Sequence, residues 1–305
     1  MSELLPVRRT DLLIACASAI GFASKGIFAK LLYARGWDFE SVLTVRAIVA
    51  LPLVWAWAIA RVGASAIWRV PLRAAVGAAA AGALCYAFGA LLDFYALTLI
   101  PAGVERVLLF SYPSMVVLLH ALLHRRAPSR RVLAAVALTY GGILLVVGGP
   151  DLQVLRGNLF GASLVLVCAL TFALYFIASD RWTQAIGSAP FTVIALSCAT
   201  ALLVLFAILH HGAVATIHPG AHDALLMAGI VLFATVLPML LMAEGVRRLG
   251  AQRSAVASTI GPPATLLMGA LFLGERLATA QWCGALLILA GIMVLQWNAA
   301  ARQPR

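Results

Sequence analysis

The chain has 305 residues, of which 63% are hydrophobic and only 11% are charged, and its mean hydropathy is +1.01. A soluble domain needs roughly a quarter of its residues charged to cover its surface, so this chain must be solvated mostly by lipid. Its net charge is +11, but the basic side chains lie between apolar segments and do not share one amphipathic face. This distribution argues against nucleic-acid binding.

Apolar segments of about 20 residues, the length that crosses a bilayer, recur along the whole chain. In chain order they are 11–33, 39–60, 74–98, 102–123, 132–148, 157–179, 189–210, 223–246, 252–273 and 279–297. The first is long enough to span the membrane and is interrupted early by Asp11, so we do not expect a cleaved signal peptide. We predict an all-α membrane protein with ten transmembrane helices.

The arginines between these segments predict the orientation of the chain. With the N-terminus placed inside the cell, only Arg35, Arg156 and Arg276 lie in outer connections, and most other loop arginines lie in inner ones. Cytoplasmic loops carry an excess of basic residues. We therefore expect a multi-pass protein of the bacterial inner (plasma) membrane with both termini in the cytoplasm.

The two halves of the sequence repeat each other. An offset of 149 residues relates Pro113 to Pro262 and Gly142 to Gly291. Each half contains five predicted helices, an odd number, so the second half enters the membrane from the opposite side. We predict two inverted five-helix repeats, 10–149 and 150–298, an arrangement in which transporters place one site near the bilayer midplane.

Prolines interrupt two of the predicted spans near their middle. Pro113 lies in "FSYPSMVVLLHALL", and Pro262 and Pro263 lie in "TIGPPATLLMGALF". A proline inside a helix removes a hydrogen bond and costs ~3 kcal/mol, and unpaired backbone at this depth is tolerated only against protein or a wet cavity. We expect kinks that act as hinges and mark the transport site. Several glycines, among them Gly141, Gly142 and Gly284, also predict close helix contacts.

Three stretches carry a resemblance to a known family: "VLTVRAIVALPL" (43–54), "ALTLIPAGVERVLLFSYPSMVVLLHALL" (96–123) and "PPATLLMGALFLGERLATAQWCGALLILAGIMVL" (262–295). They resemble the EamA family of the drug/metabolite transporter superfamily, over nearly the whole chain. The resemblance implies a metabolite or amino-acid exporter. The acidic residue of the "GERL" turn is present only as Glu275, and Ser197 stands roughly where the first half has Arg46, so the two halves differ chemically.

Charged residues inside the predicted spans are candidate site residues, because each costs roughly 2.5–3.5 kcal/mol on insertion scales. We expect Lys25 and Arg46 to line a cavity and hold a substrate carboxylate, with Asp93 and Glu105 balancing them and available for proton coupling. The alternative is a static ion-pair network that joins the first four helices. The static interpretation is favoured for three residues: Lys30, Glu105 and Arg106.

Tyr86, Tyr112 and Tyr175 are expected to complete a pocket for a small zwitterion, although buried tyrosine is often only packing. His120 and His124 have metal-ligand spacing but no accompanying carboxylate or cysteine, and the five cysteines form no C-x-x-C pair. We predict no metal and no cofactor. The sequence contains no nucleophile elbow, phosphate-binding loop or zinc-protease motif, so we do not expect an enzyme.

These observations predict a secondary transporter that moves small metabolites such as amino acids by alternating access around a midplane cavity. The family resemblance implies that the direction is export. Its expected partners are this small-molecule substrate and the lipid bilayer, and the oligomeric state is left open, with a monomer allowed. Two alternatives remain: a lipid-linked sugar flippase of the same fold, and a non-transporting membrane scaffold or enzyme.

Overall fold

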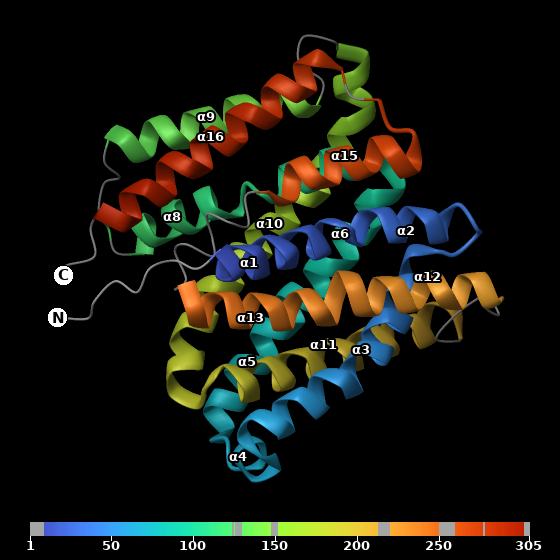
Figure 1. Ribbon diagram of the computed structural model, residues 1–305, viewed down its shortest axis with the longest axis vertical. Coiled ribbons are helices and arrows are strands. Elements are labelled where there is room, and N and C mark those ends of the chain that lie inside the picture. Colours follow the sequence, from blue (N-terminus) through green and yellow to red (C-terminus); the bar gives the residue numbers. More distant parts are fainter. Residues whose placement is uncertain are drawn as a thin grey trace.

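The computed structural model describes residues 9–123, 125, 130–147, 152–212, 220–249, 260–276 and 278–301. Within these ranges the regular secondary structure is entirely helical (Figure 1). In this described part of the chain, seven helices are long and apolar enough to cross a membrane: Thr10–Tyr33, Phe39–Val62, Leu72–Leu99, Ala102–Leu123, Arg156–Ile186, Ser188–His210 and Ala221–Met242. Three shorter apolar helices are Leu133–Val147, Gly261–Leu273 and Thr279–Val294.

These helices agree with the prediction of an all-helical membrane protein, and each of the ten predicted segments overlaps one of them. The first turn of α1 and the last turn of α16 both lie on the left side of the molecule in Figure 1. An even number of membrane crossings would place the two ends of the chain on one side. Ten crossings and cytoplasmic termini stay predictions.

The first half of the chain is built from helices that are often interrupted within one predicted span. In order they are α1 (Arg9–Ala23), α2 (Lys25–Tyr33), α3 (Phe39–Val62), α4 (Ala64–Trp68), α5 (Leu72–Gly82), the π-helical η1 (Ala83–Gly89), α6 (Ala90–Leu99), α7 (Ala102–Leu109), α8 (Tyr112–Leu123) and α9 (Arg130–Val147). The short α4 was not predicted.

The second half contains α10 (Leu152–Ile186), α11 (Ser188–His211), α12 (Ala221–Val231), the π-helical η2 (Leu232–Val236), α13 (Leu237–Leu249), α15 (Gly261–Leu273) and α16 (Thr279–Ala301). Many of these elements repeat those of the first half at the same offset of 149 residues. The π-helical segments begin at Ala83 and Leu232, and α3 and α11 both end before a glycine with positive φ, Gly63 at 77° and Gly212 at 69°. One difference stands out, because α10 is continuous where α1 and α2 are separated at Ser24.

The predicted kink prolines lie at the starts of helices in the structure. Helix α7 ends at Leu109 and α8 begins at Tyr112, so Pro113 lies in the first turn of a new helix and not inside an old one. A proline costs nothing there, because the first N–H groups of a helix have no intrahelical partner. Pro262 and Pro263 likewise occupy the first turn of α15. The part of the predicted span before Ile260 lies outside the described residues.

Helices α9 and α16 lie side by side along one edge of the bundle (Figure 1). A Cβ atom on Gly142 would lie 2.6 Å from the carbonyl oxygen of Gly284, and one on Gly284 would lie 2.6 Å from that of Gly142. The predicted close contact is therefore confirmed for these two glycines. Gly141, in contrast, has no atom within 4 Å of its Cβ position, so the prediction is wrong for that residue.

Gly142→Ala should destabilise the protein while its neighbour Gly141→Ala should not. The added methyl at Gly142 meets backbone that cannot move aside, and such overpacking costs typically about 1–3 kcal/mol. At Gly141 it enters open space and gains helix propensity. Thermal unfolding in detergent measures both variants; equal melting temperatures would contradict the close-contact assignment.

Candidate functional site

A buried ion cluster joins three helices of the first half. Lys25 is the first residue of α2, and its ammonium pairs with the carboxylate of Asp93 on α6. The same Nζ lies 3.3 Å from Oε1 of Glu105 on α7. The side chains are 14%, 5% and 1% exposed, respectively. One ammonium is therefore shared by two carboxylates in the interior.

The break between α1 and α2 places Lys25 at this point. Ser24, at the break, donates its hydroxyl to the carbonyl of Gly21 at 2.7 Å. Gly26 then allows α2 to pack closely, because a Cβ atom there would lie 3.2 Å from Cβ of Ala102 and 3.4 Å from a methyl of Leu97. This close approach to α6 and α7 brings the ammonium within reach of both carboxylates.

Arg46 on α3 reaches the same region through an aromatic ring. Its guanidinium lies 4.9 Å from the ring centroid of Phe94, and Nζ of Lys25 lies 5.6 Å from that centroid. Nη1 donates to the hydroxyl of Thr235 in η2 at 3.4 Å, and Nε has no hydrogen-bond partner. Among the described residues no carboxylate pairs with Arg46. The cation–π contact with Phe94 adds to its stabilisation.

The cluster carries more positive than negative charge. Arg106 follows Glu105 on α7, stacks its guanidinium 5.1 Å from the ring centroid of Phe110 and leaves Nε without a hydrogen bond. It interacts electrostatically with both carboxylates, and Arg46 does so with Asp93. Three cations thus face two carboxylates, an imbalance that an anion would offset.

The three predicted tyrosines belong to one aromatic group, in which the ring of Phe176 contacts those of Tyr175 and Tyr112. The hydroxyls of Tyr86 and Tyr175 form a hydrogen bond of 3.0 Å between η1 and α10. Tyr112 stacks on Phe176, with ring centroids 5.1 Å apart and planes at 6°. The structure therefore brings together Lys25, Asp93, Glu105 and, through Phe94, Arg46. It places the three tyrosines in a second, aromatic group. Phe94 was missed, because its sequence context does not distinguish it from an aromatic residue that faces lipid.

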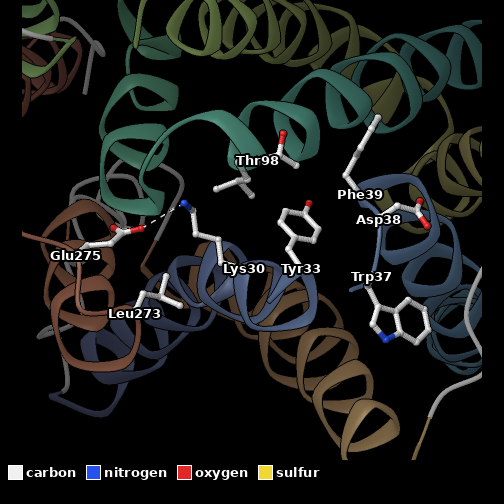
Figure 2. A pocket seen from close by; sticks show the side chains of 9 residues that line it. Lys30, Tyr33, Trp37, Asp38, Phe39, Thr98, Leu273 and Glu275 are labelled. Atoms are coloured by element: carbon white, nitrogen blue, oxygen red, sulfur yellow. Dashed lines mark ion pairs between the residues drawn. The ribbon is translucent and has the colours of Figure 1, made fainter. Parts of the chain in front are cut away.

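An open pocket of about 550 Å³ lies at the C-terminal end of α2 (Figure 2). Its lining residues share no member with the six predicted for substrate binding and are Lys30, Tyr33, Trp37, Asp38, Phe39, Leu97, Thr98, Leu273 and Glu275. Nζ of Lys30 lies 3.6 Å from Oε1 of Glu275, and the hydroxyl of Tyr33 donates to the carbonyl of Phe94 at 3.0 Å. The pocket is thus lined by residues from both halves of the chain.

Glu275, the acidic residue of the "GERL" turn, caps a helix of the other half. Its oxygens accept hydrogen bonds from the backbone N–H of Ala102 at 2.7 Å and of Gly103 at 3.2 Å, the first residues of α7. Pro101, the N-cap residue, provides no side-chain acceptor. A carboxylate at a helix N-terminus satisfies free donors and complements the helix dipole. The sequence analysis singled out Glu275, but it did not predict that Glu275 contacts the start of α7.

The histidine pair suggested by the sequence is not tested, because His124 and the side chain of His120 lie outside the described residues. Nδ1 of another histidine, His210 at the C-terminal end of α11, lies 3.0 Å from Oε2 of Glu40. Residues 213–219, which follow α11, are also outside the described part of the chain.

The fold and the buried cluster define a helical membrane protein with ionised groups in its interior. Comparison with known proteins gives the family. The model of the EamA-like transporter family matches residues 9–148 and again 159–297, so the chain belongs to this family of membrane transporters. The resemblance noted in the sequence is thereby confirmed.

Individual relatives agree with this assignment. A protein of Bacillus subtilis (strain 168), "Uncharacterized transporter YcbK", is 34% identical over 272 residues, which are 86% of this chain and 85% of that protein. An uncharacterized transporter of Synechocystis is 26% identical over 211 residues, 67% of this chain and 62% of that protein. A protein crystal structure covers 98% of this chain and 100% of its own with a TM-score of 0.67 and 17% identity, which shows a shared fold.

Glu275→Ala should destabilise the protein, since it leaves two N–H groups at the start of α7 without their acceptors. Loss of a helix cap costs typically ~1 kcal/mol. Arg276→Ala, at the exposed neighbouring position, is the matched control and should have little effect. Melting temperatures in detergent compare the two variants; a Glu275→Ala protein as stable as the control would contradict the capping role.

Proposed function

We propose that this chain is a secondary transporter of small metabolites such as amino acids, working by alternating access around a central cavity, with export as the direction that the family resemblance favours. The two repeats, 10–149 and 150–298, would move against each other in the bacterial inner membrane with both termini in the cytoplasm. Membership in a transporter family and transporter relatives support the general class.

The observation that carries the substrate class is the charge imbalance at the ion cluster. Lys25 is neutralised by two carboxylates, whereas Arg46 has a free Nε and no paired carboxylate among the described residues. A buried guanidinium is costly without a counter-ion, and its fork geometry suits a carboxylate. We assign Arg46, with Lys25, as the group that holds the carboxylate of the substrate.

We propose further roles for the remaining predicted residues. Tyr86, Tyr112 and Tyr175 would supply aromatic and hydroxyl contacts to the rest of the substrate. Asp93 and Glu105 would couple transport to protons: protonation of one carboxylate weakens its hold on Lys25, and the ammonium then becomes available to the substrate. Both carboxylates compete for that ammonium.

The helix breaks supply the points of bending. Pro113 starts α8, and Pro262 and Pro263 start α15, at equivalent positions of the two repeats. The break between α7 and α8 can change angle without losing an internal helical hydrogen bond. We propose that the repeats hinge at the starts of α8 and α15.

Arg46→Gln should raise the substrate KM by roughly tenfold or more, because a charge-assisted contact worth ~1.5–3 kcal/mol is lost. Counterflow in proteoliposomes with a panel of labelled amino acids first identifies a substrate and then measures its KM. Arg61→Gln removes the same charge at the exposed end of the same helix and should leave the KM unchanged. Equal behaviour of the two variants would favour the static ion-pair network.

Asp93→Asn should abolish uptake driven by a pH gradient while substrate exchange continues, because the amide cannot bind and release a proton. Glu105→Gln is the comparison variant, since Glu105 shares the same ammonium. Both modes of transport are measured in the same proteoliposomes. An unchanged response of Asp93→Asn to the pH gradient removes Asp93 from the coupling role.

A further inference from the structure

The pocket in Figure 2 lies one layer of side chains away from the ion cluster. Tyr33 and Leu97 line the pocket, and the Tyr33 hydroxyl donates to the carbonyl of Phe94. The ring of Phe94 in turn contacts the cations of Lys25 and Arg46. A solute in the pocket is therefore separated from the cluster by Tyr33, Leu97 and Phe94.

Lys30 supplies a cation at one end of the pocket. Its ammonium donates a hydrogen bond to no described residue, and its ion pair with Glu275 is 3.6 Å long. The Glu275 oxygens already accept the two N–H groups of α7. Figure 2 shows the Lys30 side chain extended toward Glu275 along one side of the pocket, and the side chain is 24% exposed. The long ion pair leaves the ammonium able to donate to a ligand as well.

The two carboxylates of the pocket are both held at helix N-termini. Glu275 caps α7, and Asp38 caps α3 by accepting from the backbone N–H of Ser41 at 2.8 Å and from its hydroxyl at 2.7 Å. Helix dipoles offset negative charge at these positions. Asp38 also lies across the pocket from Lys30, with Tyr33 between them (Figure 2). The end near Lys30 consequently favours an anion.

The walls of the pocket are mostly apolar. Tyr33, Trp37 and Phe39 contribute three aromatic rings, and Leu97 and Leu273 contribute aliphatic surface. A volume of about 550 Å³ lies within the range of small-molecule sites, which combine apolar walls with few polar groups that fix orientation. Such a site fits a carboxylate that carries an aromatic or branched apolar body.

We propose that this pocket is a second binding site, specific for an apolar carboxylate, in which Lys30 pairs with the carboxylate and Tyr33, Trp37 and Phe39 pack against the apolar body. That this site lies on the transport path, next to the Arg46 site, rests on the proposed function. Binding itself does not depend on that function, since the pocket and the ion cluster share no side chain.

The test is calorimetric titration of the purified full-length protein in detergent with 3-phenylpropionate, and with 3-phenylpropionamide as the uncharged match. The carboxylate should bind saturably and the amide much more weakly. Lys30→Gln should weaken binding of the carboxylate about tenfold, equivalent to about 1.4 kcal/mol. Arg276→Gln removes one positive charge beside the pocket without altering its lining and should change the Kd less than twofold. Tryptophan fluorescence is a second readout, because Trp37 lines the pocket. The change in fluorescence when the ligand binds should disappear in Trp37→Phe.

Three results would overturn the proposal: absence of saturable binding, equal binding of acid and amide, or equal Kd values for Lys30→Gln and Arg276→Gln. Arg46→Gln distinguishes this site from the proposed transport site. Its Kd for 3-phenylpropionate should equal that of the unmodified protein even though its transport KM rises. Loss of this binding in Arg46→Gln would place the ligand at the ion cluster, refuting the second site and leaving the transporter proposal intact.

Discussion

The shared ammonium of Lys25 is the interaction on which the interior of the first half depends. Asp93 and Glu105 are almost fully buried, and an uncompensated charge there would destabilise the fold by several kcal/mol. Lys25 compensates both, but only because α2 starts at that residue and Gly26 allows α2 to approach α6 and α7. The helix break, the glycine and the three ionised groups thus form one arrangement.

The two halves share helical elements but divide the chemistry unequally. The ion cluster takes its charges from the first half, with Thr235 as its contact from the second. The second half supplies Glu275, which binds the start of α7 and pairs with Lys30. A symmetric pair of repeats would duplicate both features. The sequence predicted this inequality from Arg46 and Ser197, and in the structure Ser197 accepts a hydrogen bond from the indole of Trp55 at 3.0 Å.

Hydropathy predicted most helices because lipid solvation selects for long apolar segments whatever their tertiary contacts. Proline revealed the interruption near Pro113, but the break at Ser24 depends on packing between distant helices, so no local signal revealed it. The cost of burying charge singled out Lys25, Arg46 and Asp93, but only the folded structure shows which of these residues pair. The contact of Glu275 with Ala102 spans 173 residues, and neither residue type predicts the other. The pocket was missed for the same reason, since its walls come from segments separated along the chain.

The π-helical segment η1 ends at Gly89, one turn before Asp93. A π-helical turn holds an extra residue compared with an α-helical turn, and each residue of an α-helix advances the side chains by about 100°. Removing one residue from η1 would therefore rotate Asp93 and Phe94 together away from the cations that they face. The number of residues in η1, as well as their types, therefore determines which way Asp93 faces. The π-helical segment η2 lies at the equivalent place in the second half. Length in these two segments is thus expected to be less variable than their composition.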